Sequence, residues 1–210
     1  MITEQNGNCA PIIGISRHRL ATDGCGVTTL VGFHGCPLRC RYCLNPHSFA
    51  EDTKRTVMTP EELYERVKID QLYFLASGGG VTFGGGEPLL YADFLRRFRA
   101  LCGEHWHLCA ETSLSVPWGS VQMATAVIDE FIIDCKDTDA DIYRRYTGRD
   151  NALMLDNLVR LVKLISSDRI VVRLPLIPDY NNEDARAKSR ARLEAMGVTR
   201  FDCFTYTKKQ

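Results

Sequence analysis

The sequence predicts an α/β fold built on parallel strands, and three observations support this. Nearly continuous apolar runs of strand length recur along the chain, segments with helical periodicity lie between them, and no linker or low-complexity stretch interrupts the alternation. Such β/α units form either an open doubly wound sheet or an incomplete barrel. With 210 residues the chain is long enough for one compact domain, and we expect residues 1–210 to form it.

Six strands and four helices are expected, in alternation. The strands cover residues 27–33, 80–85, 107–112, 130–135, 170–175 and 201–206. The helices cover residues 59–75, 91–102, 152–165 and 182–196. Pro60, followed by paired acids, favours the start of the first helix, and Gly197 favours the end of the last. Residues 1–26 are expected to be a lead-in, and a short tail follows residue 206.

The composition excludes several classes of partner. Lys+Arg and Asp+Glu balance at 26 each, so the net charge does not indicate a protein that binds nucleic acid or a membrane surface. The first ten residues are polar and hold no apolar core of a secretion signal, and no apolar run approaches the roughly 18 residues of a membrane span. The nine cysteines are therefore expected to be reduced thiols in the cytoplasm. The protein is expected to be a monomer.

Three cysteines lie directly after the first expected strand. Cys36, Cys40 and Cys43 have the spacing C-x3-C-x2-C. In both candidate folds the functional site lies at the carboxyl ends of the strands, which is where this loop falls. Soft thiolates select zinc or an iron–sulfur cluster. The spacing therefore indicates a metal site, although three small core residues would also fit the pattern.

The two metals make different demands on the loop. A structural zinc site takes four ligands, and His34 or His47 could complete one. A cubane iron–sulfur cluster normally takes four thiolates, and with only three, one iron stays open to a non-protein ligand. Both interpretations stay open on the cysteines alone.

A glycine-rich stretch with an acid ends the second expected strand. The sequence SGGGVTFGGGEP, residues 77–88, contains Gly84–Glu87. Glycines permit close backbone approach, and a carboxylate suits an ammonium group. The stretch lacks the Lys-Ser/Thr of a phosphate-binding loop, and its acid would repel a phosphate.

The cysteine spacing, with Tyr42 directly before the last cysteine, resembles the signature of the radical S-adenosylmethionine (SAM) superfamily. The resemblance implies an incomplete (β/α)6 barrel with parallel strands and outer helices. It also implies a [4Fe–4S] cluster whose open iron is chelated by the amino and carboxylate groups of SAM, and which in its reduced state cleaves SAM to a 5′-deoxyadenosyl radical. Gly84–Glu87 is similar to the family's GGE motif, which receives the methionine amino group.

Longer stretches narrow the resemblance to one group of the superfamily. The segment ATDGCGVTTLVGFHGCPLRCRYCLNP, from Ala21, is similar to the start of glycyl-radical-enzyme activating enzymes of the pyruvate formate-lyase activase type. The similarity continues through SGGGVTFGGGEPLL, ETS, DCKD and RLPLIPDYN, and so covers nearly the whole chain. It implies an oxidoreductase that removes the α-hydrogen of a glycine in a transiently bound glycyl radical enzyme. A flavodoxin or ferredoxin-type reductant would supply the electron. Because residues 44–76 hold no cysteine, one cluster is expected.

The resemblance also implies individual residue roles. The cluster ligands are Cys36, Cys40 and Cys43. The residues lining the SAM site are Tyr42, Asn45, Gly84, Gly85, Gly86, Glu87, Lys136 and Arg173. The residues around a possible monovalent cation are Glu111, Thr112 and Asp134. Asp23 falls in the loop that faces the incoming substrate.

Two of these assignments have structural alternatives. Asp134 and Lys136 are two residues apart on an expected strand, so they share a face and could simply form an ion pair. Arg173 stands in an otherwise apolar strand, where a buried guanidinium needs a partner. The cofactor carboxylate is one candidate for that partner.

The chain departs from the activating-enzyme pattern in several places. Cys25 replaces the proline of DGPG, Leu44 replaces a histidine, Glu111 replaces an aspartate, and Thr207 stands where a histidine is common. Three rivals therefore stay open: a radical SAM enzyme acting on a small molecule or a ribosomal peptide, a zinc-binding interaction module, and an electron carrier. The electron carrier would hold its cluster with a fourth cysteine, Cys25 or Cys9.

Overall fold

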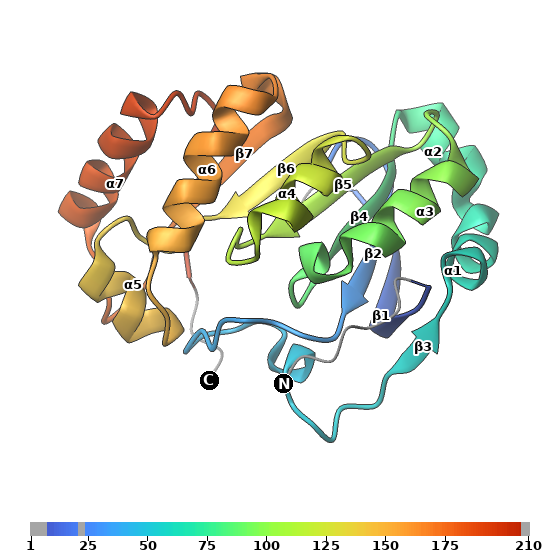
Figure 1. The fold of residues 1–210 in the computed structure, drawn as a ribbon, viewed down its shortest axis with the longest axis horizontal. Coiled ribbons are helices and arrows are strands. Elements are labelled where there is room, and N and C mark those ends of the chain that lie inside the picture. Colours follow the sequence, from blue (N-terminus) through green and yellow to red (C-terminus); the bar gives the residue numbers. More distant parts are fainter. Residues whose placement is uncertain (1–7, 21–23, 207–210) are drawn as a thin grey trace. The chain divides into compact units, whose positions relative to one another are not determined.

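The computed structural model describes residues 8–20 and 24–206, and Figure 1 labels its helices and strands. The chain divides into two compact units. Unit 1 comprises Met1–Cys36, Asn45–Glu111 and Pro117–Glu130. Unit 2 comprises Pro37–Leu44, Thr112–Val116 and Phe131–Gln210. The expectation that residues 1–210 form a single domain stays a prediction.

The sheet of unit 1 has three parallel strands and an antiparallel edge. The parallel strands are β2 (Thr28–Phe33), β4 (Gly80–Gly85) and β5 (His107–Thr112). The edge consists of β1 (Ala10–Arg19), antiparallel to β2, and β3 (Thr56–Met58), antiparallel to β1. The sequence did not predict β1 or β3, and β1 lies within the expected lead-in. Strands β2 and β4 are buried along nearly their whole length, which explains their apolar composition.

Four helices belong to unit 1. They are α1 (Pro60–Val67), α2 (Gln71–Ser77), α3 (Ala92–Cys102) and α4 (Trp118–Thr125). The single-turn 3-10 helices are η1 (Pro46–Ser48), η2 (Lys68–Asp70) and η3 (Pro88–Tyr91). The expected 59–75 helix is thus split at η2. Thr59 begins α1 with a capping box to Glu62, and α3 packs against both α1 and α4.

Unit 2 repeats the β/α alternation. Its strands are β6 (Glu130–Asp134), β7 (Ile170–Leu176) and β8 (Phe201–Thr205), and neighbouring strands in this order are parallel. Its helices are α5 (Ala140–Thr147), α6 (Ala152–Leu164), the short η4 (Ser167–Arg169) and α7 (Glu183–Ala195). All six expected strands are therefore present, which confirms the α/β class with parallel strands. Helices α4 and α5 were not predicted. Over the described part of the chain, no helix combines the length and apolar character that a membrane crossing requires.

A buried carboxylate fastens the edge strand β1 to the rest of unit 1. Asp70, on η2, is fully buried and accepts hydrogen bonds from Arg17 Nε at 2.8 Å and from Thr29 Oγ1 at 3.0 Å. His18 Nε2 lies 3.0 Å from Asp70 Oδ1. The hydrogen bonds from Arg17 outweigh the opposing effect of burial and hold the pKa of Asp70 below its ordinary value.

We expect Asp70→Asn to lower the free energy of unfolding at pH 7 by about 2 kcal/mol, the usual range for hydrogen bonds to a charged group. Because the folded-state pKa is depressed, this stabilisation is present above the unfolded-state pKa of about 3.9 and is lost as the pH falls further. Denaturant unfolding of both proteins from pH 7 downward measures the difference. The control is Asp141→Asn, because that side chain is 88% exposed. An equal loss in the control, or a difference that persists unchanged below pH 3.9, would show that the Asp70 charge does not stabilise β1.

Candidate functional site

The residues of the expected site divide between the two units. In unit 1, hydrogen bonds hold the backbone just before Cys36. The Gly35 N–H donates to the Ser48 carbonyl at 2.6 Å, and the Gly35 carbonyl accepts from the Glu87 N–H at 2.8 Å. The approach to the first cysteine is therefore fixed to η1 and to the glycine-acid stretch.

Tyr91, at the end of η3, supports the same backbone from its side chain. Its ring stacks on Phe33 with centroids 5.3 Å apart, and its hydroxyl donates to the His34 carbonyl at 2.6 Å. Burial raises the pKa of Tyr91, so the phenol stays a hydrogen-bond donor at neutral pH. The sequence did not single out Tyr91. The only available signal was an aromatic residue four positions after the expected Glu87.

We expect Tyr91→Phe to weaken the backbone that leads into Cys36. The stacking survives, but the His34 carbonyl loses its donor, which costs about 1 kcal/mol of stability. A cluster held on this loop should then lose iron several-fold faster to a chelator, as followed by visible absorbance. Tyr64→Phe is the control, because Tyr64 also stacks on an aromatic ring, that of Trp106, while its hydroxyl bonds no described group. Equal rates of iron loss in wild type and Tyr91→Phe would contradict the positioning role.

The glycine-acid stretch needs its glycines for the chain's own packing. A Cβ on Gly84 would lie 2.8 Å from Glu111 Oε2, and one on Gly86 would lie 2.2 Å from the Gly35 carbonyl oxygen. Glu87 is only 1% exposed, and its Oε1 accepts the Leu89 N–H at 3.2 Å, at the start of η3. Other atoms thus come close to the backbone of this stretch, as expected, and those atoms belong to the protein itself.

A cavity of about 550 Å³ lies beside this stretch within unit 1. Two residues expected in the SAM site, Gly85 and Asn45, line it together with residues of β1 and β2 such as Ile13 and Leu30. Its volume falls in the range of small-molecule sites, roughly 300–1,000 Å³.

In unit 2, the segment carrying Cys40 and Cys43 is bound to the C-terminus of α5. The last carbonyls of a helix have no partner within the helix. Here the Thr147 carbonyl accepts the Arg39 N–H at 2.9 Å, and the Tyr146 carbonyl accepts the Arg41 N–H at 3.1 Å. The end of α5 thereby fixes the backbone on both sides of the second cysteine.

Cys36, Cys40 and Cys43 are all free thiols, and this donor set fits a cubane cluster with one iron left open. Burial raises the pKa of Cys40 to about 11, and the nearby Lys136 only partly opposes this. Iron bound at this thiol would therefore displace its proton. Over residues 8–20 and 24–206, no three histidine, cysteine or acidic side chains form a group that could hold a single metal ion.

Tyr42 lies in an aromatic cluster of unit 2. Its hydroxyl donates to Asp179 at 2.8 Å, and its ring makes edge contacts with Tyr146 and Tyr180, at centroid distances of 6.0 and 5.6 Å. Asp179 has φ of +69°, a conformation in which its carboxylate meets the phenol. No local pattern in the sequence connects Tyr146 or Tyr180 with Tyr42, since each comes from a different segment.

Four charged residues form a row across the three strands of unit 2. Asp134 Oδ2 lies 3.1 Å from Lys136 Nζ, which is the ion pair considered from the sequence. Arg173 lies between Asp134, at 3.9 Å, and Asp202, at 3.4 Å. Arg173 therefore has partners within the chain, and the cofactor is not needed to explain its burial.

Lys136 also contacts the end of the described chain. Its Nζ donates to the Tyr206 hydroxyl at 3.2 Å. Burial disfavours the charged form, but Asp134 and the neighbouring phenols prevail, and the pKa of Lys136 is raised well above its ordinary value. Lys136 is thus a buried ammonium group that keeps its charge at neutral pH.

The residues expected around a cation have other contacts. Thr112 Oγ1 accepts the Leu114 N–H at 2.9 Å, and Asp134 faces the two cationic side chains named above. Glu111 lies against Gly84 within unit 1. Asp23 and Thr207 lie outside the described residues.

Comparison with known families decides which of the open interpretations holds. Residues 30–188 match the family model described as the Radical SAM superfamily. The chain belongs to this superfamily. It is a radical SAM enzyme, and its cofactors are a [4Fe–4S] cluster and SAM. The zinc module and the simple electron carrier are thereby set aside.

Curated relatives narrow the family further. The chain is 31% identical over 230 residues to the (2S)-3-sulfopropanediol dehydratase activating enzyme of Klebsiella oxytoca, covering 80% of this chain and 72% of that protein. It is 32% identical over 171 residues to the pyruvate formate-lyase-activating enzyme of Clostridium pasteurianum, covering 81% and 71%. This radical SAM enzyme therefore belongs to the family of activating enzymes.

Solved structures confirm the fold. SuiB of Streptococcus suis, bound to S-adenosylmethionine, matches with a TM-score of 0.63 at 14% identity, over 86% of this chain and 43% of that one. The protein anSMEcpe with bound AdoMet matches with a TM-score of 0.57 at 18% identity, over 81% and 49%. At these identities the likeness concerns the fold alone, and it agrees with the expected incomplete (β/α)6 barrel of the radical SAM type.

Proposed function

We propose that this radical SAM enzyme activates a glycyl radical enzyme by removing the α-hydrogen of a glycine in that partner. The observation that carries the proposal is the identity of 31% and 32% to activating enzymes whose named target enzymes differ, over about four fifths of this chain in each case. Similarity to the activating enzyme of only one target would support the proposal less, because the shared residues could then serve that one target.

In this proposal the cysteine trio holds the cluster, through Cys36, Cys40 and Cys43. The SAM site is lined by Tyr42, Asn45, Gly84, Gly85, Gly86, Glu87, Lys136 and Arg173. When bound, the reduced cluster and SAM together supply a 5′-deoxyadenosyl radical that takes the hydrogen atom. The protein itself needs no acid or base for that step, and it contributes binding, orientation and exclusion of water.

Several features of unit 1 and unit 2 support this assignment. The cavity of about 550 Å³ has the size of a small-molecule site and is lined by Gly85 and Asn45. Glu87 offers a buried carboxylate suited to an ammonium group. Lys136 offers a buried, charged ammonium group suited to a carboxylate.

The partner presents its glycine on a loop that leaves its own fold, so the complex is transient. A flavodoxin or ferredoxin-type protein supplies the electron, and the enzyme acts as a monomer. Asp23 belongs to the loop that faces the partner. A monovalent cation held by Glu111, Thr112 and Asp134 stays a prediction.

The test is the formation of a glycyl radical. The protein is reconstituted anaerobically with iron and sulfide, reduced, and mixed with SAM and, in turn, with each glycyl radical enzyme of its source organism. We expect 5′-deoxyadenosine by mass spectrometry and a glycyl radical signal by electron paramagnetic resonance. Replacing the radical-bearing glycine of the partner with alanine should remove the resonance signal.

The two products separate the outcomes. If 5′-deoxyadenosine forms without a glycyl radical on the partner, the activase proposal is wrong. That result would support the alternative function, a radical SAM enzyme that modifies a small molecule or a peptide.

A further inference from the structure

We propose that three exposed arginines beside the second half of the cysteine loop, Arg41, Arg145 and Arg149, form the docking surface for an acidic one-electron carrier protein. These three residues are called the arginine patch below. The inference rests on the proposed function only in that the cluster must be reduced from outside. No motif in the sequence marks any of the three.

The geometry of unit 2 brings the patch to the cysteines. Arg41 directly follows Cys40, and its N–H is bonded to Tyr146, the residue after Arg145. Arg149 Nε donates to the carbonyl of Pro37, at the start of the same loop, at 3.3 Å. The cysteine loop and the end of α5, which are bonded to each other, therefore carry all three arginines.

The patch is positively charged because its members have no acidic partner. All three side chains are exposed, and within the described ranges none of them forms an ion pair. The side chains of Arg145 and Arg149 donate to carbonyl oxygens, those of Tyr180 at 3.2 Å and Pro37 at 3.3 Å.

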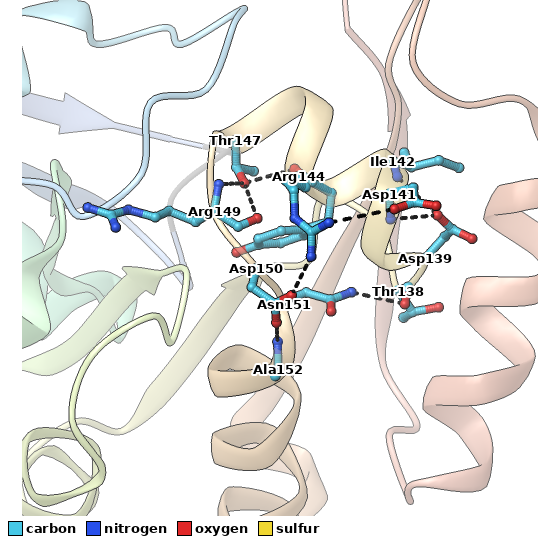
Figure 2. A network of polar contacts seen from close by, with 11 residues as sticks. Thr138, Asp139, Asp141, Ile142, Arg144, Thr147, Arg149, Asp150, Asn151 and Ala152 are labelled. Atoms are coloured by element: carbon cyan, nitrogen blue, oxygen red, sulfur yellow. Dashed lines mark hydrogen bonds and ion pairs between the residues drawn. The ribbon is translucent and has the colours of Figure 1, made fainter.

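The acids nearby are already engaged. Figure 2 shows Arg144 between Asp141, at 3.8 Å, and Asp150, at 2.9 Å, while the Arg149 side chain reaches away from both. Asp179 accepts the hydrogen bond of Tyr42. Asp141 and Asp150 thus pair with Arg144 and not with any member of the arginine patch.

The charge of the patch contrasts with the chain as a whole, whose net charge is zero. A local positive surface on a neutral protein steers an acidic partner to one place and does not promote general anion binding. That place is beside Cys40 and Cys43, where a carrier can approach the cluster closely. One electron leaves the carrier, which is thereby oxidised, and enters the cluster, whose charge falls by one. No bond forms or breaks.

A triple variant tests the patch: Arg41→Gln, Arg145→Gln and Arg149→Gln. The control variant removes the same number of charges from arginines paired within their own helices, by Arg96→Gln, Arg160→Gln and Arg190→Gln. The probe is a reduced flavodoxin, which is an acidic carrier. Stopped-flow absorbance of the reconstituted enzyme measures the second-order rate constant of cluster reduction.

At low ionic strength we expect the triple variant to be reduced at least about tenfold more slowly than wild type, within the range of electrostatic steering. The control variant should stay close to wild type. The difference should shrink as salt screens the charges. A reduced viologen, a small cationic reductant, should reduce all three proteins at similar rates, which shows that the clusters are intact.

Three results would overturn the inference. The first is a triple variant that flavodoxin reduces at the wild-type rate. The second is a control variant whose rate of reduction by flavodoxin falls as much as that of the triple variant. The third is a triple variant that is slow with the viologen too, because the arginines would then support the cluster itself.

The readout does not depend on glycine chemistry. If the triple variant is slow with flavodoxin and no glycyl radical forms on the partner, the docking inference holds and the proposed function fails. If flavodoxin reduction is normal but viologen-reduced triple variant activates the partner slowly, the patch docks the glycyl radical enzyme, and the inference is wrong.

Discussion

Replacing Cys40 with alanine is expected to abolish cleavage of SAM. A cluster with one open iron is held by three thiolates, and removing one leaves a second iron without a protein ligand. Cys40 is also the thiol whose backbone the end of α5 holds on both sides, through Arg39 and Arg41. After anaerobic reconstitution, we expect Cys40→Ala to retain little iron and to form no 5′-deoxyadenosine above the reagent blank. Iron per chain and mass spectrometry of the product measure both effects.

Cys102→Ala is the matched control for this experiment. Cys102 ends α3, outside the trio, and its thiol lies 3.8 Å from the Arg99 carbonyl. We expect this variant to keep both its iron and its product. Wild-type product from Cys40→Ala, or an equal loss in Cys102→Ala, would show that the trio does not hold the catalytic cluster.

Those elements of the fold that carry their own hydrophobic signal could be predicted from the sequence. Strand β4 is buried at nearly every position, so its residues are apolar or small apart from the buried Thr82. The outer half of β1 is exposed, and the apolar run of this strand ends near Ile15. Pairing with the next strand, β2, makes this segment a strand, although its exposed half has no apolar pattern of its own.

Helices α4 and α5 were not predicted from the sequence, each for a different reason. Helix α4 begins after Pro117 with no side-chain cap and contains Gly119, so its sequence holds few helical signals. Helix α5 has a start signal and a stop signal: Asp139 caps its first turn, and Gly148 ends it at φ of +74°. Its eight residues make only about two turns, too few for a periodic apolar pattern.

In the candidate site too, some features have a local sequence pattern and others depend on the fold. The cysteines and Gly84–Glu87 could be found because each motif is contiguous in sequence. Asp202, which faces Arg173, could not be found, since the pair depends on the register between β7 and β8. Tyr91 meets the His34 carbonyl across 57 positions of sequence. Contacts of this kind follow from the fold rather than from any local pattern.

Gly86→Ala is expected to be the most damaging of the small substitutions. The added Cβ would lie 2.2 Å from the Gly35 carbonyl oxygen and 2.8 Å from that of Phe33. Both oxygens belong to the backbone, and both accept hydrogen bonds from this stretch. The Gly35 carbonyl accepts from the Glu87 N–H at 2.8 Å, and the Phe33 carbonyl accepts from the Gly86 N–H at 2.9 Å. The clash therefore cannot be relieved by rotating a side chain. Relief requires moving the segment that leads into Cys36.

We expect Gly86→Ala to lower the free energy of unfolding by about 3 kcal/mol, the upper end for overpacking, and to reduce iron retention after reconstitution. Denaturant unfolding of the cluster-free protein separates the two effects, because it measures the packing alone. Gly119→Ala is the control, since its Cβ would meet no atom within 4 Å and the position lies in α4. There the alanine should be neutral or stabilise by up to about 1 kcal/mol. Unchanged unfolding of Gly86→Ala would mean that the glycine-acid stretch does not approach the cysteine loop as closely as the structure shows, and that Gly86 is free to serve the cofactor alone.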